Sequence, residues 1–184
     1  HTRSEVVTGV QTCAPPISRL PFQLTNSQRQ ATWEIFQDLT KDTPMNRLLQ
    51  GDVGAGKTIV ATLAIYSASI NRAQSALLTP TAILAHQHYQ NLKTYFSHSN
   101  LNIALLTGAT KQKSTIKADV KAGKIDLVIG THALLTDDTE FQNLSLVIID
   151  EQHRFGVEQR QKLLLKSPPH LSPHLLTMTA TPIP

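Results

Sequence analysis

The chain has 184 residues, of which 40% are hydrophobic and 16% are charged, and its formal net charge is +4. This composition excludes a disordered tail, and no apolar run approaches the roughly 20 residues that a membrane-spanning helix needs. The single cysteine, Cys13, excludes an internal disulfide and a cysteine metal cluster, so we expect a reducing compartment, the cytoplasm.

The first residues differ in character from the rest of the chain. They show no periodicity that connects them to the later residues, and Val7–Ile17 differs only at Pro15 from the translation of a common sequencing-library adapter. We therefore expect residues 1–17 to be a non-native, adapter-derived segment, with an ordinary polar linker as the alternative. The chain also stops abruptly at Pro184, so we expect residues 18–184 to form a domain that is truncated at its C-terminal end.

From Arg19 onward, helical and strand patterns alternate. Thr25 to Gln28 is a capping-box signature for a helix to about Leu39. Its apolar residues are expected to face inward; these are Trp33, Ile35, Phe36 and Leu39. Further helices are expected at Lys57–Ile70, from Pro80 to about Phe96, and near Lys111–Ala122. Strands are expected at Arg47–Gln50, Ser75–Thr79, Asn102–Thr107, Ile125–Ile129, Leu146–Ile149 and Leu175–Thr179. Strands that alternate with crossover helices predict an α/β domain with a mostly parallel sheet and helices on both faces. A truncation after the last of these strands would leave it with an exposed edge.

A glycine-rich segment lies between the first predicted strand and the next helix. GDVGAGKT, Gly51–Thr58, matches G-x-x-x-x-G-K-[ST] in the strand–turn–helix context that this motif requires. Backbone N–H groups of such a loop and of the helix N-terminus can surround phosphate oxygens. The lysine can reach the β- and γ-phosphates, and the threonine hydroxyl can bind Mg²⁺. The predicted nucleotide-binding residues of the loop are Gly51, Val53, Gly54, Ala55, Gly56, Lys57 and Thr58.

Two adjacent carboxylates end another predicted strand, in LVIIDEQHRFGVEQRQK. Mg²⁺ takes hard oxygen ligands together with phosphate and water, so Asp150 is expected to bind Mg²⁺ with Thr58. Hydrolysis also needs a group that orients or deprotonates the attacking water, and Glu151 suits that role. An Asp-Glu pair alone would be weak support, but together with the phosphate loop it predicts Lys57, Asp150 and Glu151 as catalytic residues.

Six motifs in order give the chain a family resemblance that covers nearly everything from Phe22 to Pro184. They are PMNRLLQGDVGAGKT, PTAILAHQHY, LLTGAT, GTHALL, IIDEQHRFGVEQR and MTATPIP. The chain resembles the superfamily 2 helicases, and among them the RecG family of branch-migrating DNA helicases. The related transcription-repair coupling translocases typically have a different residue in place of Gln50 and a glutamate in place of Gln152, so both residues favour RecG. The resemblance implies a RecA-like P-loop NTPase fold.

The resemblance also implies roles for individual residues. Phe22 and Gln28 match the segment that reads the adenine of ATP in related motors, although a core aromatic and a helix-capping glutamine are equally good explanations. The residues that match DNA-backbone contacts are Pro80, Thr81, Thr107, Gly108, Gly130, Thr131 and His132. The residues that match the coupling of nucleotide state to DNA are Gln152, His153, Arg154, Thr179 and Thr181. The family usually has glutamate where Ala82 stands, a departure that concerns DNA contacts and not ATP binding.

The resemblance implies partners as well. It predicts a monomeric, ATP- and Mg²⁺-dependent DNA helicase of the bacterial cytoplasm that acts on branched DNA in repair and recombination. Superfamily 2 motors use a second RecA-like domain that supplies arginines, and RecG proteins have an upstream wedge domain. Without these parts, we expect the chain alone to be nearly inactive. Two alternatives stay open: the motor domain of a transcription-repair coupling translocase, and a stand-alone P-loop nucleotide-binding module without a DNA role.

Overall fold

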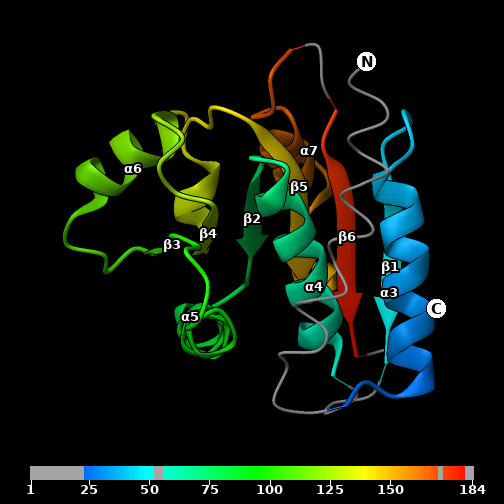
Figure 1. Ribbon diagram of the computed structural model, residues 1–184. Helices are drawn as coiled ribbons and strands as arrows, with labels where there is room; N and C mark the ends of the chain where they lie inside the picture. Colours follow the sequence, from blue (N-terminus) through cyan, green and yellow to red (C-terminus); the bar gives the residue numbers. More distant parts are fainter. Residues whose placement is uncertain (1–22, 52–55, 170–171, 181–184) are drawn as a thin grey trace.

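A computed structural model describes residues 23–51, 56–169 and 172–180 (Figure 1). The predictions for residues 1–17, Phe22, Val53–Ala55 and Thr181 lie outside these described residues. The strands are β1 (Asn46–Gln50), β2 (Gln74–Leu78), β3 (Ile103–Leu106), β4 (Leu127–Gly130), β5 (Leu144–Asp150) and β6 (His174–Thr179). The helices are α3 (Asn26–Leu39), α4 (Lys57–Ile70), α5 (Ala82–Tyr95), α6 (Lys113–Lys121) and α7 (Val157–Leu164), with short 3-10 helices η1 (His132–Leu135) and η2 (Gln152–Arg154).

All six strands form one sheet, in the order β1-β6-β5-β2-β4-β3, and every neighbouring pair is parallel. The predicted α/β fold with a parallel sheet and helices on both faces is therefore confirmed. The last strand, however, has no exposed edge, because β6 inserts between β1 and β5 and pairs with both. The outer strands of the described sheet are β1 and β3.

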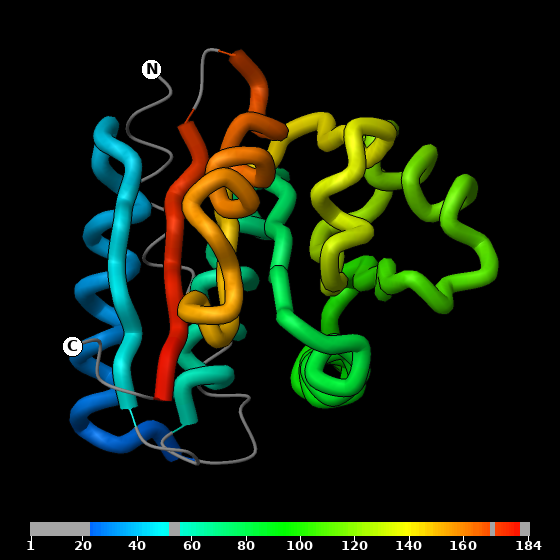
Figure 2. Tube along the Cα trace, turned by 180° about the vertical axis from the view of Figure 1, so that it is seen from behind, coloured from blue at the N-terminus to red at the C-terminus, as the bar shows by residue number. Residues whose placement is uncertain are grey.

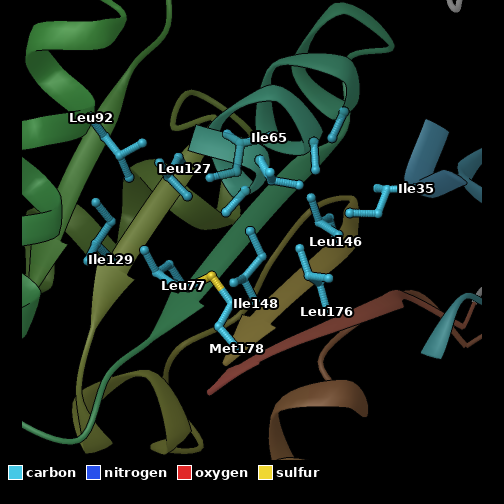
Figure 3. Packing of buried hydrophobic residues seen from close by; sticks show 14 of the residues in the cluster. Ile35, Ile65, Leu77, Leu92, Leu127, Ile129, Leu146, Ile148, Leu176 and Met178 are labelled. Atoms are coloured by element: carbon cyan, nitrogen blue, oxygen red, sulfur yellow. The ribbon is translucent and has the colours of Figure 1, made fainter. Parts of the chain in front are cut away.

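Alternate residues of the strands supply two cores, one on each face of the sheet. In β2, Leu77 belongs to the core under α3, α4 and α5, whereas Ala76 and Leu78 belong to the core under α6, η1 and α7. Figure 2 shows the face on which α7 lies. Figure 3 shows the first core, in which the labelled residues are Ile35, Ile65, Leu77, Leu92, Leu127, Ile129, Leu146, Ile148, Leu176 and Met178.

Helix α3 begins as predicted, and its core-facing side differs from the prediction at Trp33. Thr25 Oγ1 accepts a hydrogen bond from the backbone of Gln28, and the Gln28 side chain accepts one from the Thr25 backbone, so the capping box is present. The buried positions are Thr32, Ile35 and Phe36, whereas Trp33 is 55% exposed, so the prediction that Trp33 faces inward is wrong. Since each residue advances about 100° around a helix, Thr32 and Trp33 cannot both lie at the centre of one face.

Helix α4 lies in the middle of its layer. Its sequence KTIVATLAIYSASI is apolar on nearly all sides, which is typical of a helix with neighbours on both flanks. It packs between α3 and α5 and over β2 and β5. The helix that begins with the predicted phosphate-binding lysine is therefore the central helix of this layer.

A histidine joins the edge strand to the rest of the sheet and should make folding sensitive to pH. The Met45 backbone N–H donates to His174 Nδ1 at 2.8 Å, and the Leu175 backbone N–H donates to Met45 O at 2.8 Å. Burial lowers the pKa of His174 below its ordinary value of 6.5, against a weaker opposite effect of Asp38. Between the folded-state pKa and 6.5, the unfolded chain binds more protons, so the free energy of unfolding falls as the pH falls through this window.

We expect His174→Asn to reduce this pH dependence, because the amide oxygen still accepts from Met45 but does not titrate. Each unit of pKa difference corresponds to about 1.4 kcal/mol of unfolding free energy. Urea denaturation of both proteins on the two sides of pH 6.5 measures the difference. Parallel stability curves for the two proteins would contradict this assignment.

Candidate nucleotide-binding site

Among the described residues, Gly51 follows β1, and Asp150 and Glu151 lie at the end of β5, on the two strands that flank β6. The parallel register places Gln50 opposite Thr179 and Asp150 opposite Met178. The loops that leave β1 and β5 are both attached to the backbone of β6: Gly51 N–H donates to Thr179 O at 3.3 Å, and Glu151 N–H donates to Met178 O at 3.0 Å. Carboxyl ends of strands in open parallel sheets are where ligands bind.

The phosphate loop enters α4 through a left-handed glycine. Gly56 has φ +75°, a conformation that side chains rarely adopt, and a Cβ added there would lie 2.1 Å from Gln28 Nε2. Lys57 is the first residue of α4, and its Nζ donates to the carbonyl oxygen of Gly51 at 2.7 Å. No side chain of the described residues caps this helix N-terminus. Its backbone N–H groups and the ammonium group suit an anion.

Gln28 caps α3, which confirms one of the two explanations that the sequence left open, and it also borders the phosphate loop. Its Oε1 accepts from the Thr25 backbone at 2.9 Å, as a capping glutamine does. Its Nε2 lies against Gly56, so the same side chain borders the phosphate loop. A residue that caps α3 therefore also lies beside the residue that precedes α4, and its contact with the adenine stays a prediction.

Glu151 has an unusual backbone conformation. Its φ and ψ are 53° and 54°, the left-handed region, which costs a residue with a side chain about 1–3 kcal/mol. This turn directs the chain out of β5 into η2, and the N–H of Arg154 donates to Glu151 O at 2.9 Å. Glu151 Oε2 lies 3.5 Å from His153 Nδ1, within ion-pair distance when the histidine is protonated. The backbone strain thus accompanies a carboxylate that is partly exposed at the strand ends.

Asp150 has a partner that the sequence did not indicate. Its Oδ2 lies 2.7 Å from Nε2 of His88, a residue on the buried side of α5, 62 positions earlier in the chain. His88 lies four residues after Leu84 and four residues before Leu92 on this helix. The available signal was that spacing, because a polar residue between two apolar ones at i−4 and i+4 lies on the inward face.

The predicted DNA contacts follow the other three strands, at the same edge of the sheet. Pro80 and Thr81 follow β2, Thr107 and Gly108 follow β3, and Thr131 and His132 follow Gly130, the last residue of β4. The edge therefore has two halves: in one, β1 and β5 carry predicted nucleotide residues and flank β6; in the other, β2, β4 and β3 carry the predicted DNA residues.

These predicted DNA residues differ in exposure and in the structural roles that they already have. Thr81 caps α5 by accepting from Leu84 N–H at 3.2 Å, and Thr81 is exposed. Thr107 is buried, with its hydroxyl 3.4 Å from that of Thr110. A Cβ added at Gly130 would lie 2.2 Å from the backbone oxygen of Leu106, so close packing of β3 and β4 already requires this glycine.

The described coupling residues lie in the nucleotide half of the edge, directly after β5 and at the end of β6. η2 contains Gln152, His153 and Arg154, of which the last two are exposed, and it lies against β6. Thr179, the last residue of β6, is buried. The ring of Phe155, directly after η2, packs edge-on against His132 with the ring centroids 5.8 Å apart. The segment that follows Asp150 and Glu151 thus contacts His132, one of the predicted DNA-binding residues.

The donor set suits a cation that is shared with a phosphate group. Among the described residues, no three His, Cys, Asp or Glu side chains gather into a metal cluster. Mg²⁺ usually keeps several waters and binds one or two carboxylates plus substrate phosphates, so it does not need such a cluster. Asp150, at the end of β5, and Thr58, in the first turn of α4, are residues of the kind required.

The described part of the chain includes no helix that is both long enough and apolar enough to span a membrane.

Comparison with known proteins identifies the class. The family of DEAD/DEAH box helicases matches residues 25–184. The chain therefore belongs to the DEAD/DEAH box helicase family.

Within this family, the chain is similar to RecG. It is 54% identical over 170 residues to the ATP-dependent DNA helicase RecG of Aquifex aeolicus, covering 91% of this chain and 21% of that protein. It is 51% identical over 170 residues to the RecG protein of Bacillus subtilis, covering 91% and 24% respectively. A solved structure of RecG bound to a three-way DNA junction matches with a TM-score of 0.81 and 44% identity, over 100% of this chain and 25% of that one. The predicted resemblance to RecG is confirmed, and the chain spans between a fifth and a quarter of the length of these relatives.

Proposed function

We propose that the chain is the ATP-binding motor domain of a RecG-type DNA helicase, which couples ATP hydrolysis to movement along branched DNA. The observation that carries this proposal is the shared edge of the sheet. The phosphate loop and the carboxylates follow β1 and β5, and the predicted DNA contacts follow β2, β4 and β3 at the same edge. The solved RecG relative is bound to a three-way DNA junction, which supports branched DNA as the partner.

Different residues of the chain bind the phosphates, the adenine and Mg²⁺ and activate the attacking water. Lys57 and the backbone of the phosphate loop bind the β- and γ-phosphates, Phe22 and Gln28 border the adenine, and Thr58 and Asp150 hold Mg²⁺. A Mg²⁺ ion held by these residues would supply positive charge against the phosphate oxygens. Glu151 orients the attacking water and accepts its proton. In this proposal a second RecA-like domain supplies the arginines, so the chain alone hydrolyses ATP slowly.

The DNA-facing residues bind the sugar-phosphate backbone. Hydroxyl groups and backbone N–H groups at helix starts contact phosphates and position the protein without reading base sequence. Residues of η2 and of the end of β6 couple the binding and hydrolysis of ATP to these DNA contacts. The protein acts as a monomer in the bacterial cytoplasm, on replication forks and recombination intermediates, together with a wedge domain.

Linkage between nucleotide and DNA tests this function. The affinity of the chain for a fluorescent ATP analogue in Mg²⁺ is measured with and without a three-way DNA junction. We expect saturating junction to change the affinity by about 5-fold or more, the usual size of coupling between two sites. A linear duplex of the same total length is the control and should change it less. If the analogue binds but no DNA changes its affinity, the chain is a nucleotide-binding module and the helicase function is wrong.

A further inference from the structure

The contact between His88 and Asp150 joins a helix of one half of the edge to the predicted Mg²⁺ ligand of the other. His88 lies on α5, which packs over β3 and β4, and Asp150 ends β5. β2 separates β5 from β4 in the sheet, so this side chain reaches across the end of β2. The atoms His88 Nε2 and Asp150 Oδ2 are 2.7 Å apart, and the two side chains are only 11% and 13% exposed.

The chemistry of the contact fixes its direction. An ionised carboxylate only accepts hydrogen bonds, so Nε2 of His88 must carry a proton and be the donor of this hydrogen bond. A neutral imidazole in that tautomer is sufficient. Among the described residues, this is the hydrogen bond that the Asp150 carboxylate receives, and it engages Oδ2 alone. In the described part of the chain, no hydrogen bond to Oδ1 accompanies it.

The packing of α5 makes the imidazole a rigid support. Ala85 and Leu92, three residues before and four residues after His88, are 0% and 1% exposed and lie on the same buried face. The helix begins at the cap Thr81, seven residues or about 10 Å before His88. A shift of this predicted DNA-contacting helix start along its axis would therefore move the group that holds Asp150.

We propose that His88 is a positioning residue for the Mg²⁺ site: it holds one oxygen of Asp150 so that the other binds the cation, and it links that ligand to the DNA-contacting start of α5. This inference rests on the proposed function. Partners that orient a metal ligand through a hydrogen bond usually contribute about 10- to 100-fold to metal affinity. The requirement is an N–H donor at this place, not a histidine as such.

The test compares two substitutions of similar length in the complete chain. His88→Met keeps bulk on the buried face but cannot donate, whereas His88→Gln provides an N–H donor at the end of a flexible side chain. His86→Met, at an exposed position of the same helix, is the matched control. Affinity for a fluorescent ATP analogue is measured in Mg²⁺ and in EDTA, and thermal melting reports folding.

We expect the gain in affinity that Mg²⁺ gives to fall by about 10-fold in His88→Met, with the affinity in EDTA unchanged. His88→Gln should recover most of this gain, and His86→Met should match the parent. Junction DNA should also change the Mg²⁺-dependent affinity less in His88→Met than in the parent. A purely structural role would lower both affinities together and would not be rescued by glutamine.

Two results would overturn the inference: a folded His88→Met with the parent's full Mg²⁺ gain, or a folded His88→Gln that loses it. If His88→Met does not fold, His88→Gln alone decides. Failure of the proposed function looks different. In that case the parent does not bind the ATP analogue, or Lys57→Ala leaves the affinity for the analogue unchanged.

Discussion

Substitution of Lys57 by alanine is expected to weaken the binding of ATP by about 10- to 100-fold. Lys57 begins α4 directly after the left-handed Gly56, so its ammonium group lies beside the helix N-terminus where phosphate oxygens would bind. A hydrogen bond to a charged group contributes about 1.5–3 kcal/mol, and each 1.4 kcal/mol changes the dissociation constant tenfold. The substitution also removes the bond from Nζ to Gly51 O, which joins the two ends of the phosphate loop.

A second lysine gives a matched control for this experiment. Lys113 is the first residue of α6, as Lys57 is of α4, and Lys113→Ala removes the same charge from the start of a different helix. Equilibrium titration of both variants with a fluorescent ATP analogue measures the effect. Equal losses of affinity would mean that net charge, and not the phosphate loop, attracts the nucleotide.

Glu151→Gln is expected to lower the rate of ATP hydrolysis by about 10²–10⁴-fold while leaving the affinity for ATP within about 3-fold of the parent. The amide keeps the shape of the side chain but cannot accept a proton from water, and general-base catalysis contributes a factor of this size. Binding should persist because the phosphates are held by the loop and by Mg²⁺ ligands, of which Glu151 is not one.

Single-turnover release of phosphate, with the chain in excess over labelled ATP, detects rates low enough for this comparison. Glu140→Gln, which neutralises an exposed carboxylate outside the six family motifs, is the control and should react at the rate of the parent. A Glu151→Gln variant that binds and hydrolyses ATP like the parent would remove Glu151 from the mechanism.

Local patterns in the sequence predicted the strands and most of the helices, and they are clearest in the strands that are buried throughout. β2 and β4 are buried at every position, and their apolar runs reflect this. Helix α7 was missed because VEQRQKLL buries only Leu163 and shows no apolar stripe. Trp33 was misplaced because hydrophobicity alone does not say which of two adjacent helical positions faces the core.

The parts of the site that could be predicted are those whose residues lie close together in the sequence. The phosphate loop and the Asp-Glu pair are contiguous motifs, and the rule that ligands bind at carboxyl ends of strands puts them on one edge. The hydrogen bond from His88 to Asp150 was not predictable in this way. It joins residues 62 positions apart, and it depends on the strand order β5-β2-β4, which periodicity does not encode.

The insertion of β6 between β1 and β5 determines when the nucleotide site can form during folding. Within the described sheet, β1 pairs with β6 alone, and Met45 bonds to a residue 129 positions later. Closing so long a loop is slow compared with forming local helices. As the ribosome releases the chain, the phosphate loop emerges early but its strand has no partner until residues 174–179 follow. Acquisition of ATP affinity during synthesis would therefore mark the completion of the sheet.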